Sequence, residues 1–362
     1  MRAMVLKDKQ LSIEELPAPR PGPGEVLARV LACGICGSDL HAARYMDDMV
    51  SAARTSRRRN WYGSDIDAGI VMGHEFVCEV LEPGEGVEGW EPGTRVTSMP
   101  VLLSPGTPAG TRSIGYATEI PGAYGEQVIL SVPLLLRVPD HVSDIVAATT
   151  EPCAVGLHAV RESRIQPNES ALVMGAGPIG LMTLIWLKKT GVHYIAVSDP
   201  APERRALAAS LGADDVFDPN AVDLAEVLDQ ALTSRRNSTP RGELGYGAPA
   251  TSQAPAVVFE CVGVPGTLQQ AMQLVTVRGR VVVVGVCMQE DRIRPLVGIN
   301  KQLTLQFVLG YTATEFAETL QAFIDGDVDT TPLVTRTVPL EELPAAFSAL
   351  ADPKDCKVVV VP

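Results

Sequence analysis

Short apolar runs broken by proline and glycine dominate the first part of the chain. Between residue 1 and about residue 150, these runs are rich in β-branched residues and are separated by turn formers, a pattern typical of strands joined by loops. Strands are predicted at 26–31, 76–81, 95–99 and 127–131. Because an apolar period of 3.6 residues is scarce in this region, we expect a β-rich unit with few helices.

From about residue 153 the pattern changes to apolar runs that alternate with helical segments. Strands are predicted at 171–174, 194–198, 216–217, 256–259 and 280–285, and helices at 178–187, 203–211 and 266–274. Strands that alternate with helices form βαβ units, so this half predicts an α/β fold with a doubly wound parallel sheet. About 30 residues at the C-terminal end return to a mixed strand and helix pattern.

Length and charge narrow the class of protein. A chain of 362 residues is too long for one ordinary core, which favours two domains. Its formal net charge of -13 would be repelled by phosphate backbones, so no nucleic-acid partner is expected. No apolar run reaches the roughly 18 residues that a membrane helix needs, so no membrane association is expected either.

The cysteines indicate the compartment. The chain has seven, an odd number at scattered positions, which argues against a secreted disulfide framework. The first residues also lack the apolar core of a signal peptide. We therefore predict a cytoplasmic protein whose thiols are reduced and free to bind metal.

A glycine-rich turn follows the strand predicted at 171–174. In such a turn one glycine permits the tight bend, one lets the backbone approach a pyrophosphate, and one lets the helix pack against the strand. The helix N-terminus then offers free N–H groups to the phosphates. The residues predicted to bind a dinucleotide are Gly175, Gly177, Pro178, Ile179 and Gly180.

Asp199 ends the next predicted strand. A carboxylate there can accept hydrogen bonds from the adenosine ribose hydroxyls and would repel a 2′-phosphate, which favours NAD over NADP. Arg204 is a further predicted cofactor-binding residue, and together with Arg205 it would weaken that preference. The alternative interpretation is a glycine turn that binds no nucleotide.

Four short patterns contain side chains that zinc uses as ligands. None is specific alone: a Cys-x-x-Cys pair can be a redox pair or half of a zinc knuckle, and a lone His-Glu pair is more often an ordinary polar pair. No second Cys-x-x-Cys exists, which excludes a four-thiolate site. The patterns are Cys33-x-x-Cys36 with Ser38, Asp39 and His41, then Gly73-His74-Glu75, then Glu151-Pro152-Cys153, and then His158.

In their order along the chain, these motifs resemble those of the zinc-containing medium-chain alcohol and polyol dehydrogenases. The resemblance covers nearly the whole chain. It implies a GroES-like β-barrel catalytic domain of residues 1–153 and 305–362, and a Rossmann NAD-binding domain of residues 154–304. It also implies an active site in the cleft between the two domains.

The resemblance further implies one catalytic zinc per chain, held by Cys36, His74 and Glu151, the last either directly or through a water molecule, with Glu75 as a neighbouring carboxylate that can move onto the metal. Asp39 resembles the carboxylate that orients the histidine ligand. Three protein ligands leave one position open for substrate. Zinc lowers the pKa of a bound alcohol, and the hydride then passes to NAD.

Ser38 and His41 resemble the relay that removes the substrate's proton. The Ser38 hydroxyl takes the proton, and the His41 imidazole exchanges it with solvent. The alternative for His41 is a surface or core histidine. Cys33 matches no ligand position and is interpreted as a small buried residue, while His158 is interpreted as an ordinary helix residue.

Three stretches depart from the family pattern. Residues 98–125 hold no cysteine, so the structural zinc of many members is not expected here. The stretch 42–70, with a basic run at 54–59, is interpreted as an insertion, and 234–254 as a loop. The residues after His41 are not the aromatic pair of sorbitol-type enzymes, which argues against a sugar-alcohol substrate.

The sequence thus predicts a zinc-dependent oxidoreductase that transfers a hydride between a small alcohol or carbonyl and NAD(H). Two alternatives on the same fold remain. One is a zinc-free quinone or enoyl reductase, and the other is a catalytically silent nucleotide-binding protein. By analogy with the family, a homodimer or homotetramer is expected.

Overall fold

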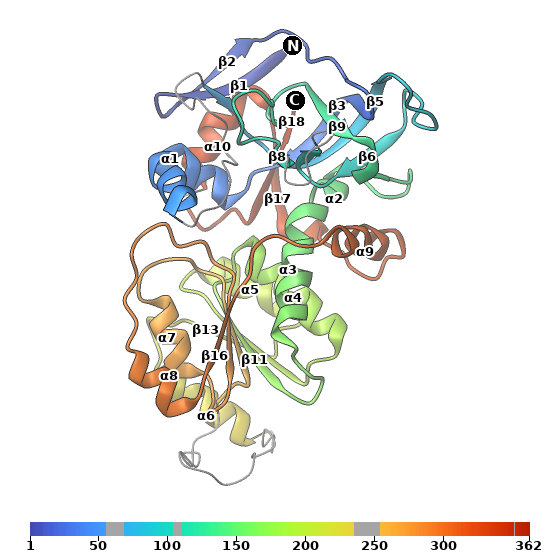
Figure 1. Ribbon diagram of the computed structural model, residues 1–362. Coiled ribbons are helices and arrows are strands. Elements are labelled where there is room, and N and C mark those ends of the chain that lie inside the picture. The colour runs from blue at the N-terminus through green and yellow to red at the C-terminus, as the bar shows by residue number, and fades with distance from the viewer. Residues whose placement is uncertain (56–68, 104–110, 235–253, 351) are drawn as a thin grey trace. The chain divides into compact units, whose positions relative to one another are not determined.

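The computed structural model describes residues 1–55, 69–103, 111–234, 254–350 and 352–362 (Figure 1). The chain forms two compact units. Unit 1 combines Met1–Pro152 with Ala313–Pro362, and unit 2 is Cys153–Thr312. The basic run at 54–59, the stretch 104–110 and the loop predicted at 234–254 lie largely outside the described residues.

Unit 1 is rich in β-strands, as predicted; most neighbouring strands pair antiparallel, while β17 and β18 pair in parallel. Its largest sheet has the order β10-β6-β5-β3-β18-β17, with β9 also paired to β3, and two smaller sheets are β2-β1-β4 and β7-β8. The strands are β1 (Arg2–Lys7), β2 (Gln10–Glu15), β3 (Glu25–Gly34), β4 (Ile70–Val71), β5 (Glu75–Pro83), β6 (Arg95–Ser98), β7 (Val101–Leu103), β8 (Thr111–Ser113), β9 (Gln127–Ser131), β10 (Leu135–Arg137), β17 (Val334–Pro339) and β18 (Lys357–Val361).

Register in the large sheet brings distant segments together at one end of β3. Gly34, the last residue of β3, lies opposite Glu75, the first residue of β5. On the other side of β3, Gly34 lies opposite Val359 of β18. The turn after β3, the start of β5 and the start of β18 therefore meet.

Unit 1 contains more helix than the sequence led us to expect. Its helices are α1 (Gly37–Thr55), α2 (Asp144–Ala148), α9 (Ala313–Ile324) and α10 (Leu343–Ala349), with single 3-10 turns η2 (Val132–Leu134), η3 (Thr331–Leu333) and η4 (Leu340–Glu342). The expectation of few helices was wrong for α1. The backbone leaves helical geometry at Tyr45, with φ -132° and ψ 32°, so no single apolar period runs through the segment.

Unit 2 contains a parallel sheet whose order is β13-β12-β11-β14-β15-β16. In chain order this is the 3-2-1-4-5-6 arrangement of doubly wound dinucleotide-binding folds, as the alternating pattern predicted. The strands are β11 (Ser170–Met174), β12 (Tyr194–Ser198), β13 (Asp215–Phe217), β14 (Val257–Glu260), β15 (Arg280–Val283) and β16 (Thr304–Phe307).

Helices cover this sheet on both faces. Figure 1 shows α7 and α8 on one side and α4 on the other. Buried side chains of the sheet, such as Leu172, Tyr194 and Val258, pack with Leu228 of α6 and Ala271 of α7. The helices are α3 (Thr150–Ser163), which begins at the end of unit 1, α4 (Pro178–Thr190), α5 (Pro202–Ser210), α6 (Leu224–Ser234), α7 (Thr267–Leu274) and α8 (Pro295–Lys301).

The second boundary of unit 2 lies beyond the sequence-based position at 304. Strand β16 pairs in parallel with β15, and the unit continues to Thr312. Residues 304–307 alternate polar and apolar side chains and are only partly buried, as on the edge of a sheet. They lack the continuous apolar run that revealed the inner strands. Among the described residues, no helix has the length and apolar character to cross a membrane.

Candidate active site

Two glycines shape the backbone around the end of β3. Gly73 has φ +95°, and a Cβ there would lie 2.7 Å from the backbone nitrogen of Tyr124. A Cβ on Gly34 would lie 2.0 Å from Oε2 of Glu75. These positions need glycine because the backbone or a buried carboxylate already occupies the space. The turn after β3 and the start of β5 can therefore approach closely.

This approach gathers a thiol, an imidazole and a carboxylate. The ligand atoms of Cys36, His74 and Glu75 all lie within 4.8 Å of one another. In the described part of the chain, this is the group of three or more His, Cys, Asp or Glu side chains that could hold a metal ion. His74 and Glu75 are buried, while Cys36 is partly exposed. Sulfur, nitrogen and oxygen donors at this spacing are a set that zinc uses, so the residues fit the metal that the sequence implied.

Asp39 lies at the centre of the contacts behind this group. Its fully buried carboxylate accepts hydrogen bonds from the Cys36 backbone nitrogen at 3.2 Å and from the Tyr124 hydroxyl at 2.6 Å. Nδ1 of His74 lies 3.2 Å from Oδ1 of Asp39, as an ion pair rather than an aligned hydrogen bond. With Nδ1 facing Asp39, Nε2 is the nitrogen left for a metal.

Charge outweighs burial at this pair. Burial alone would raise the pKa of Asp39, but His74 and the hydrogen bonds from Tyr124 and Cys36 hold it below its ordinary value. Burial alone would lower the pKa of His74, yet Asp39 together with Cys36 raises it well above the usual range. The Asp39 carboxylate therefore stays ionised and can orient the ring.

Glu75 is held by a lysine from the far end of the sequence. Lys357 Nζ, on β18, donates to Oε1 and Oε2 of Glu75 at 2.8 and 2.7 Å and to the Ile35 carbonyl oxygen at 2.9 Å. Burial lowers the pKa of Lys357, but Glu75 and Cys36 more than compensate and raise it. Movement of Glu75 onto a metal would break this buried pair.

The two predicted relay residues have different surroundings. The Ser38 hydroxyl donates to Sγ of Cys36 at 3.0 Å and accepts from the Tyr116 hydroxyl at 2.7 Å. His41 lies in α1, and its Nδ1 is buried without a hydrogen-bond partner among the described residues. Burial, and then Arg44, lower the pKa of His41, so the ring is neutral near pH 7.

Glu151 is not brought into the cluster. It lies in the first turn of α3 and is partly exposed. Among the described residues, the ligand atoms that lie within 4.8 Å of one another are those of Cys36, His74 and Glu75. Its role as a direct metal ligand stays a prediction. Cys33 is fully buried as expected, and burial, then Asp39 and Glu75, raise its pKa well above the ordinary value.

Three residues at this site were absent from the sequence-based list: Tyr116, Tyr124 and Lys357. The sequence offers one signal for Lys357, which directly precedes the valines of β18. A lysine in an otherwise apolar strand needs a partner of opposite charge. The two tyrosines come from the segment between β8 and β9, which has little regular structure. Nothing in its pattern marks either ring.

The glycine turn of unit 2 has the predicted place between β11 and α4. Gly175 has φ +91°, and a Cβ on Gly180 would lie 1.8 Å from the Gly175 carbonyl oxygen. A Cβ on Gly177 would meet only Nη1 of Arg204, at 4.0 Å, so the space beside this residue is open. Pro178 and Ile179 begin α4. An open turn at a helix N-terminus fits a pyrophosphate.

Asp199 follows β12 directly and joins it to the glycine turn. Its Oδ2 accepts from the Ala176 backbone nitrogen at 2.8 Å, and its Oδ1 accepts from the Ala201 nitrogen at 2.8 Å. Each oxygen keeps a second lone pair for a ribose hydroxyl. Nε of Arg204 is buried without a hydrogen-bond partner among the described residues, whereas Arg205 takes part in an ion pair.

One chain thus combines a doubly wound sheet that has an open glycine turn with a β-rich unit that gathers donors of the kind zinc uses. This combination defines the architecture of a pyridine-nucleotide dehydrogenase. Family comparisons agree with this class. Residues 22–140 match the alcohol dehydrogenase GroES-like domain, and residues 178–325 match the zinc-binding dehydrogenase domain. The chain belongs to the medium-chain dehydrogenase/reductase family.

Individual relatives extend over the full length. The chain is 32% identical to (R,R)-butanediol dehydrogenase of Bacillus subtilis strain 168, over 98% of this chain and 97% of the relative. The crystal structure of 2R,3R-butanediol dehydrogenase from Bacillus subtilis matches with a TM-score of 0.81 and 31% identity, covering 100% and 99% of the two chains. An alcohol dehydrogenase from E. coli CFT073, complexed with NADH, matches with a TM-score of 0.81, 25% identity and coverage of 100% and 99%.

Proposed function

We propose that this chain is a zinc-dependent oxidoreductase that transfers a hydride between a small alcohol or carbonyl compound and NAD(H). The observation that carries the proposal is the cluster of Cys36, His74 and Glu75, with the histidine oriented by the buried Asp39. Such an orienting carboxylate is what a metal-binding histidine needs. Family membership and the glycine turn support the same conclusion.

Cys36 and His74 would hold the metal in this proposal, with Glu151 as the further ligand and Glu75 kept nearby by Lys357. When bound, zinc supplies a Lewis acid that makes a substrate hydroxyl more acidic. The protein's own task is to keep the imidazole in one orientation. Asp39 does so through Nδ1, while the buried surroundings keep bulk water away from the carboxylate.

Proton removal is assigned to Ser38, with His41 as the outer member of the relay. The Ser38 hydroxyl lies 3.0 Å from Cys36 Sγ and is therefore next to the position of the reacting group. A neutral His41 can accept a proton, and its lowered pKa is consistent with that state.

The proposed cofactor is NAD, bound by Gly175, Gly177, Pro178, Ile179 and Gly180. Asp199 favours it over NADP, because a 2′-phosphate would meet a buried carboxylate. Arg204 lies close to the open side of the turn and would contact the cofactor. Comparing NADH and NADPH binding by fluorescence titration tests this preference, and tighter binding of NADPH would contradict the role of Asp199.

The proposed substrates are small alcohols, and the relative named for butanediol directs the first assay toward vicinal diols. We also infer a cytoplasmic homodimer or homotetramer. Large exposed apolar side chains on and beside α8 and β16 support self-association: Leu296, Ile299, Phe307 and Leu309. Light scattering of the purified protein tests it, and a monomer at micromolar concentration would refute it.

The two alternative functions predict different metal contents. A zinc-free reductase or a silent nucleotide-binding protein has no use for an imidazole oriented by a buried carboxylate. The test is zinc per chain in wild type, in Cys36→Ala and in Cys287→Ala, an exposed thiol outside the cluster. We expect one zinc in wild type and the control, loss in Cys36→Ala, and NADH formation from alcohols only where zinc is retained.

Folded wild type that binds no zinc would support the zinc-free reductase. Zinc and NADH binding without turnover on any alcohol or carbonyl would support the silent protein. Two zincs per chain would contradict the interpretation of the cysteine-free stretch 98–125.

A further inference from the structure

The ring of Tyr116 lies against the candidate metal cluster, although no site prediction included it. Its hydroxyl lies 2.7 Å from Oγ of Ser38 and 3.3 Å from Oδ1 of Asp39. The ring packs near His74, with centroids 5.2 Å apart and planes tilted by 39°. Only 9% of the residue is exposed, so the phenol oxygen faces the interior of unit 1.

The hydroxyls of Tyr116 and Ser38 each have one proton and two lone pairs. In one arrangement Tyr116 donates to Ser38, and Ser38 donates to Sγ of Cys36 at 3.0 Å. In the other, Tyr116 donates to Asp39, which frees the phenol oxygen to accept the Ser38 proton. The Ser38 oxygen occupies the same place in both arrangements, but its lone pairs point differently.

Either arrangement leaves Ser38 a lone pair for a substrate hydroxyl, because its own proton is directed at Cys36 in the first and at Tyr116 in the second. To accept a proton from a substrate hydroxyl, Ser38 must present a lone pair and direct its own proton elsewhere. A serine side chain without a fixed partner would also populate other rotamers. The phenol oxygen of Tyr116 supplies the fixed partner in both arrangements, 2.7 Å from Oγ of Ser38.

We propose that Tyr116 is a positioning residue that holds the Ser38 hydroxyl beside Cys36 with a lone pair directed at the substrate. The inference rests on the proposed dehydrogenase function and adds a residue to it. Tyr116 acts through Ser38 and touches no reacting atom itself. The Tyr116 hydroxyl fixes the position of the inner end of the relay, whether or not His41 forms the outer end.

Tyr124 provides a matched control within the same site. Its hydroxyl donates to Oδ2 of Asp39 at 2.6 Å and to the Gly34 carbonyl oxygen at 3.3 Å. Both tyrosines thus contact the same carboxylate, but the hydrogen bond to Ser38 comes from Tyr116. Replacing either by phenylalanine removes one oxygen and keeps the ring.

The experiment is a double-mutant cycle on the zinc-loaded enzyme with Tyr116→Phe, Ser38→Ala and the double variant. Tyr116→Phe should lower kcat about 3- to 10-fold, the worth of one hydrogen bond, with KM and zinc content unchanged. In the Ser38→Ala background the same change should have no further effect. Tyr124→Phe should instead combine additively with Ser38→Ala.

A second cycle measures urea unfolding of the metal-free protein, where a direct Tyr116–Ser38 bond makes the two substitutions non-additive. Wild-type kcat in Tyr116→Phe, or an equal loss in both backgrounds, would overturn the proposal. So would additive unfolding effects. If wild type formed no NADH, the dehydrogenase function would fail, while the unfolding cycle would still decide whether Tyr116 holds Ser38.

Discussion

Replacing Lys357 by methionine should lower the unfolding free energy of unit 1 by about 3–5 kcal/mol, the typical cost of breaking a buried ion pair. Methionine keeps most of the length and the apolar stem of the side chain. What it removes is the charge, so the carboxylate of Glu75 would remain buried without a counter-ion.

The contacts of the ammonium group account for this magnitude. Its three hydrogen bonds go to both oxygens of Glu75 and to a backbone carbonyl, at 2.7 to 2.9 Å. The side chains of Lys357 and Glu75 are 2% and 0% exposed, so water cannot replace the lost partner. For a unit of this size the loss should lower the melting temperature by on the order of 10 °C.

The assay is urea unfolding of metal-free protein, followed by circular dichroism, so that no part of the loss comes from metal binding. Lys354→Met is the control: that ammonium is 75% exposed and lies 3.7 Å from Asp352, an arrangement that contributes little. Adding Glu75→Gln to Lys357→Met should restore part of the stability, because no charge is then left buried. A loss for Lys357→Met within 1 kcal/mol of the control would refute the reasoning.

Three further outcomes follow from local geometry. Gly34→Ala should lower both the unfolding free energy and the zinc content, because the added Cβ would lie 2.0 Å from a buried carboxylate oxygen of Glu75. Gly37→Ala is the control and should be tolerated, since its Cβ would meet nothing within 4 Å. Calorimetry and metal analysis compare the two variants, and equal tolerance would contradict the prediction. Gly177→Ala should leave the fold intact but weaken NADH binding at least tenfold in a fluorescence titration, because the added Cβ would point into the space beside the turn. An unchanged affinity would show that the cofactor does not occupy that space. Burial raises the pKa of Cys153 to about 12, so at pH 8 only about one Cys153 thiol in ten thousand is ionised. Iodoacetamide should therefore modify the exposed Cys287 long before the buried Cys153. Comparable modification rates in mass spectrometry would refute the burial argument.

What the sequence predicted well was encoded within short stretches. The order of strands and helices in unit 2 follows from alternating apolar runs, and the glycine turn lies in six consecutive residues. Strand β9 was predicted with its observed limits, Gln127–Ser131, because its apolar residues are bounded by turn formers. Each of these features depends on neighbours along the chain.

What the sequence did not reveal depends on contacts between distant segments. Lys357 and Glu75 are 282 positions apart, and Tyr116 and Ser38 are 78 apart. Helix α1 was missed because its kink at Tyr45 breaks the apolar period. Local patterns do not specify which residue faces another across a sheet, and that pairing is what completes the cluster.

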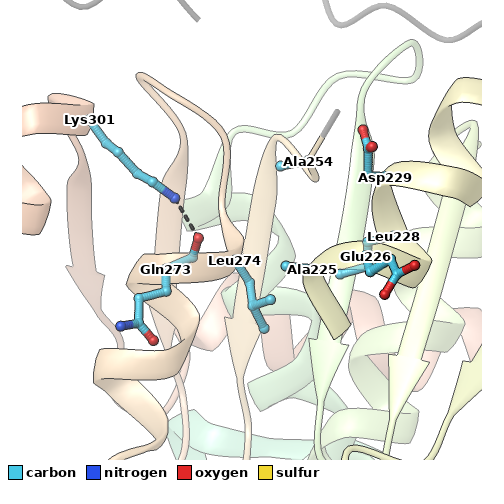
Figure 2. A pocket seen from close by; sticks show the side chains of 8 residues that line it. All are labelled: Ala225, Glu226, Leu228, Asp229, Ala254, Gln273, Leu274 and Lys301. Carbon is cyan, nitrogen blue, oxygen red and sulfur yellow. Dashed lines mark hydrogen bonds between the residues drawn. The ribbon is translucent and has the colours of Figure 1, made fainter. Parts of the chain in front are cut away.

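A pocket in unit 2 lacks the chemistry of the candidate active site. It lies in unit 2 among α6, α7 and the end of α8, and Figure 2 shows Lys301 donating to the backbone oxygen of Gln273 on one side of it. Glu226 and Asp229 provide carboxylates on its other side. None of the described residues that line it carries a ring, a thiol or an imidazole, so they offer none of the donors that the reaction needs.

The pairing of β18 with β3 has a consequence for biosynthesis. The lysine that neutralises Glu75 follows the whole nucleotide-binding unit along the chain, so it leaves the ribosome after that unit. Until then residues 1–152 lack both strand β18 and the cation that pairs with Glu75. We therefore expect unit 1 to complete its fold after unit 2 has been translated, although most of its residues are translated first, and the candidate metal site would be completed with it.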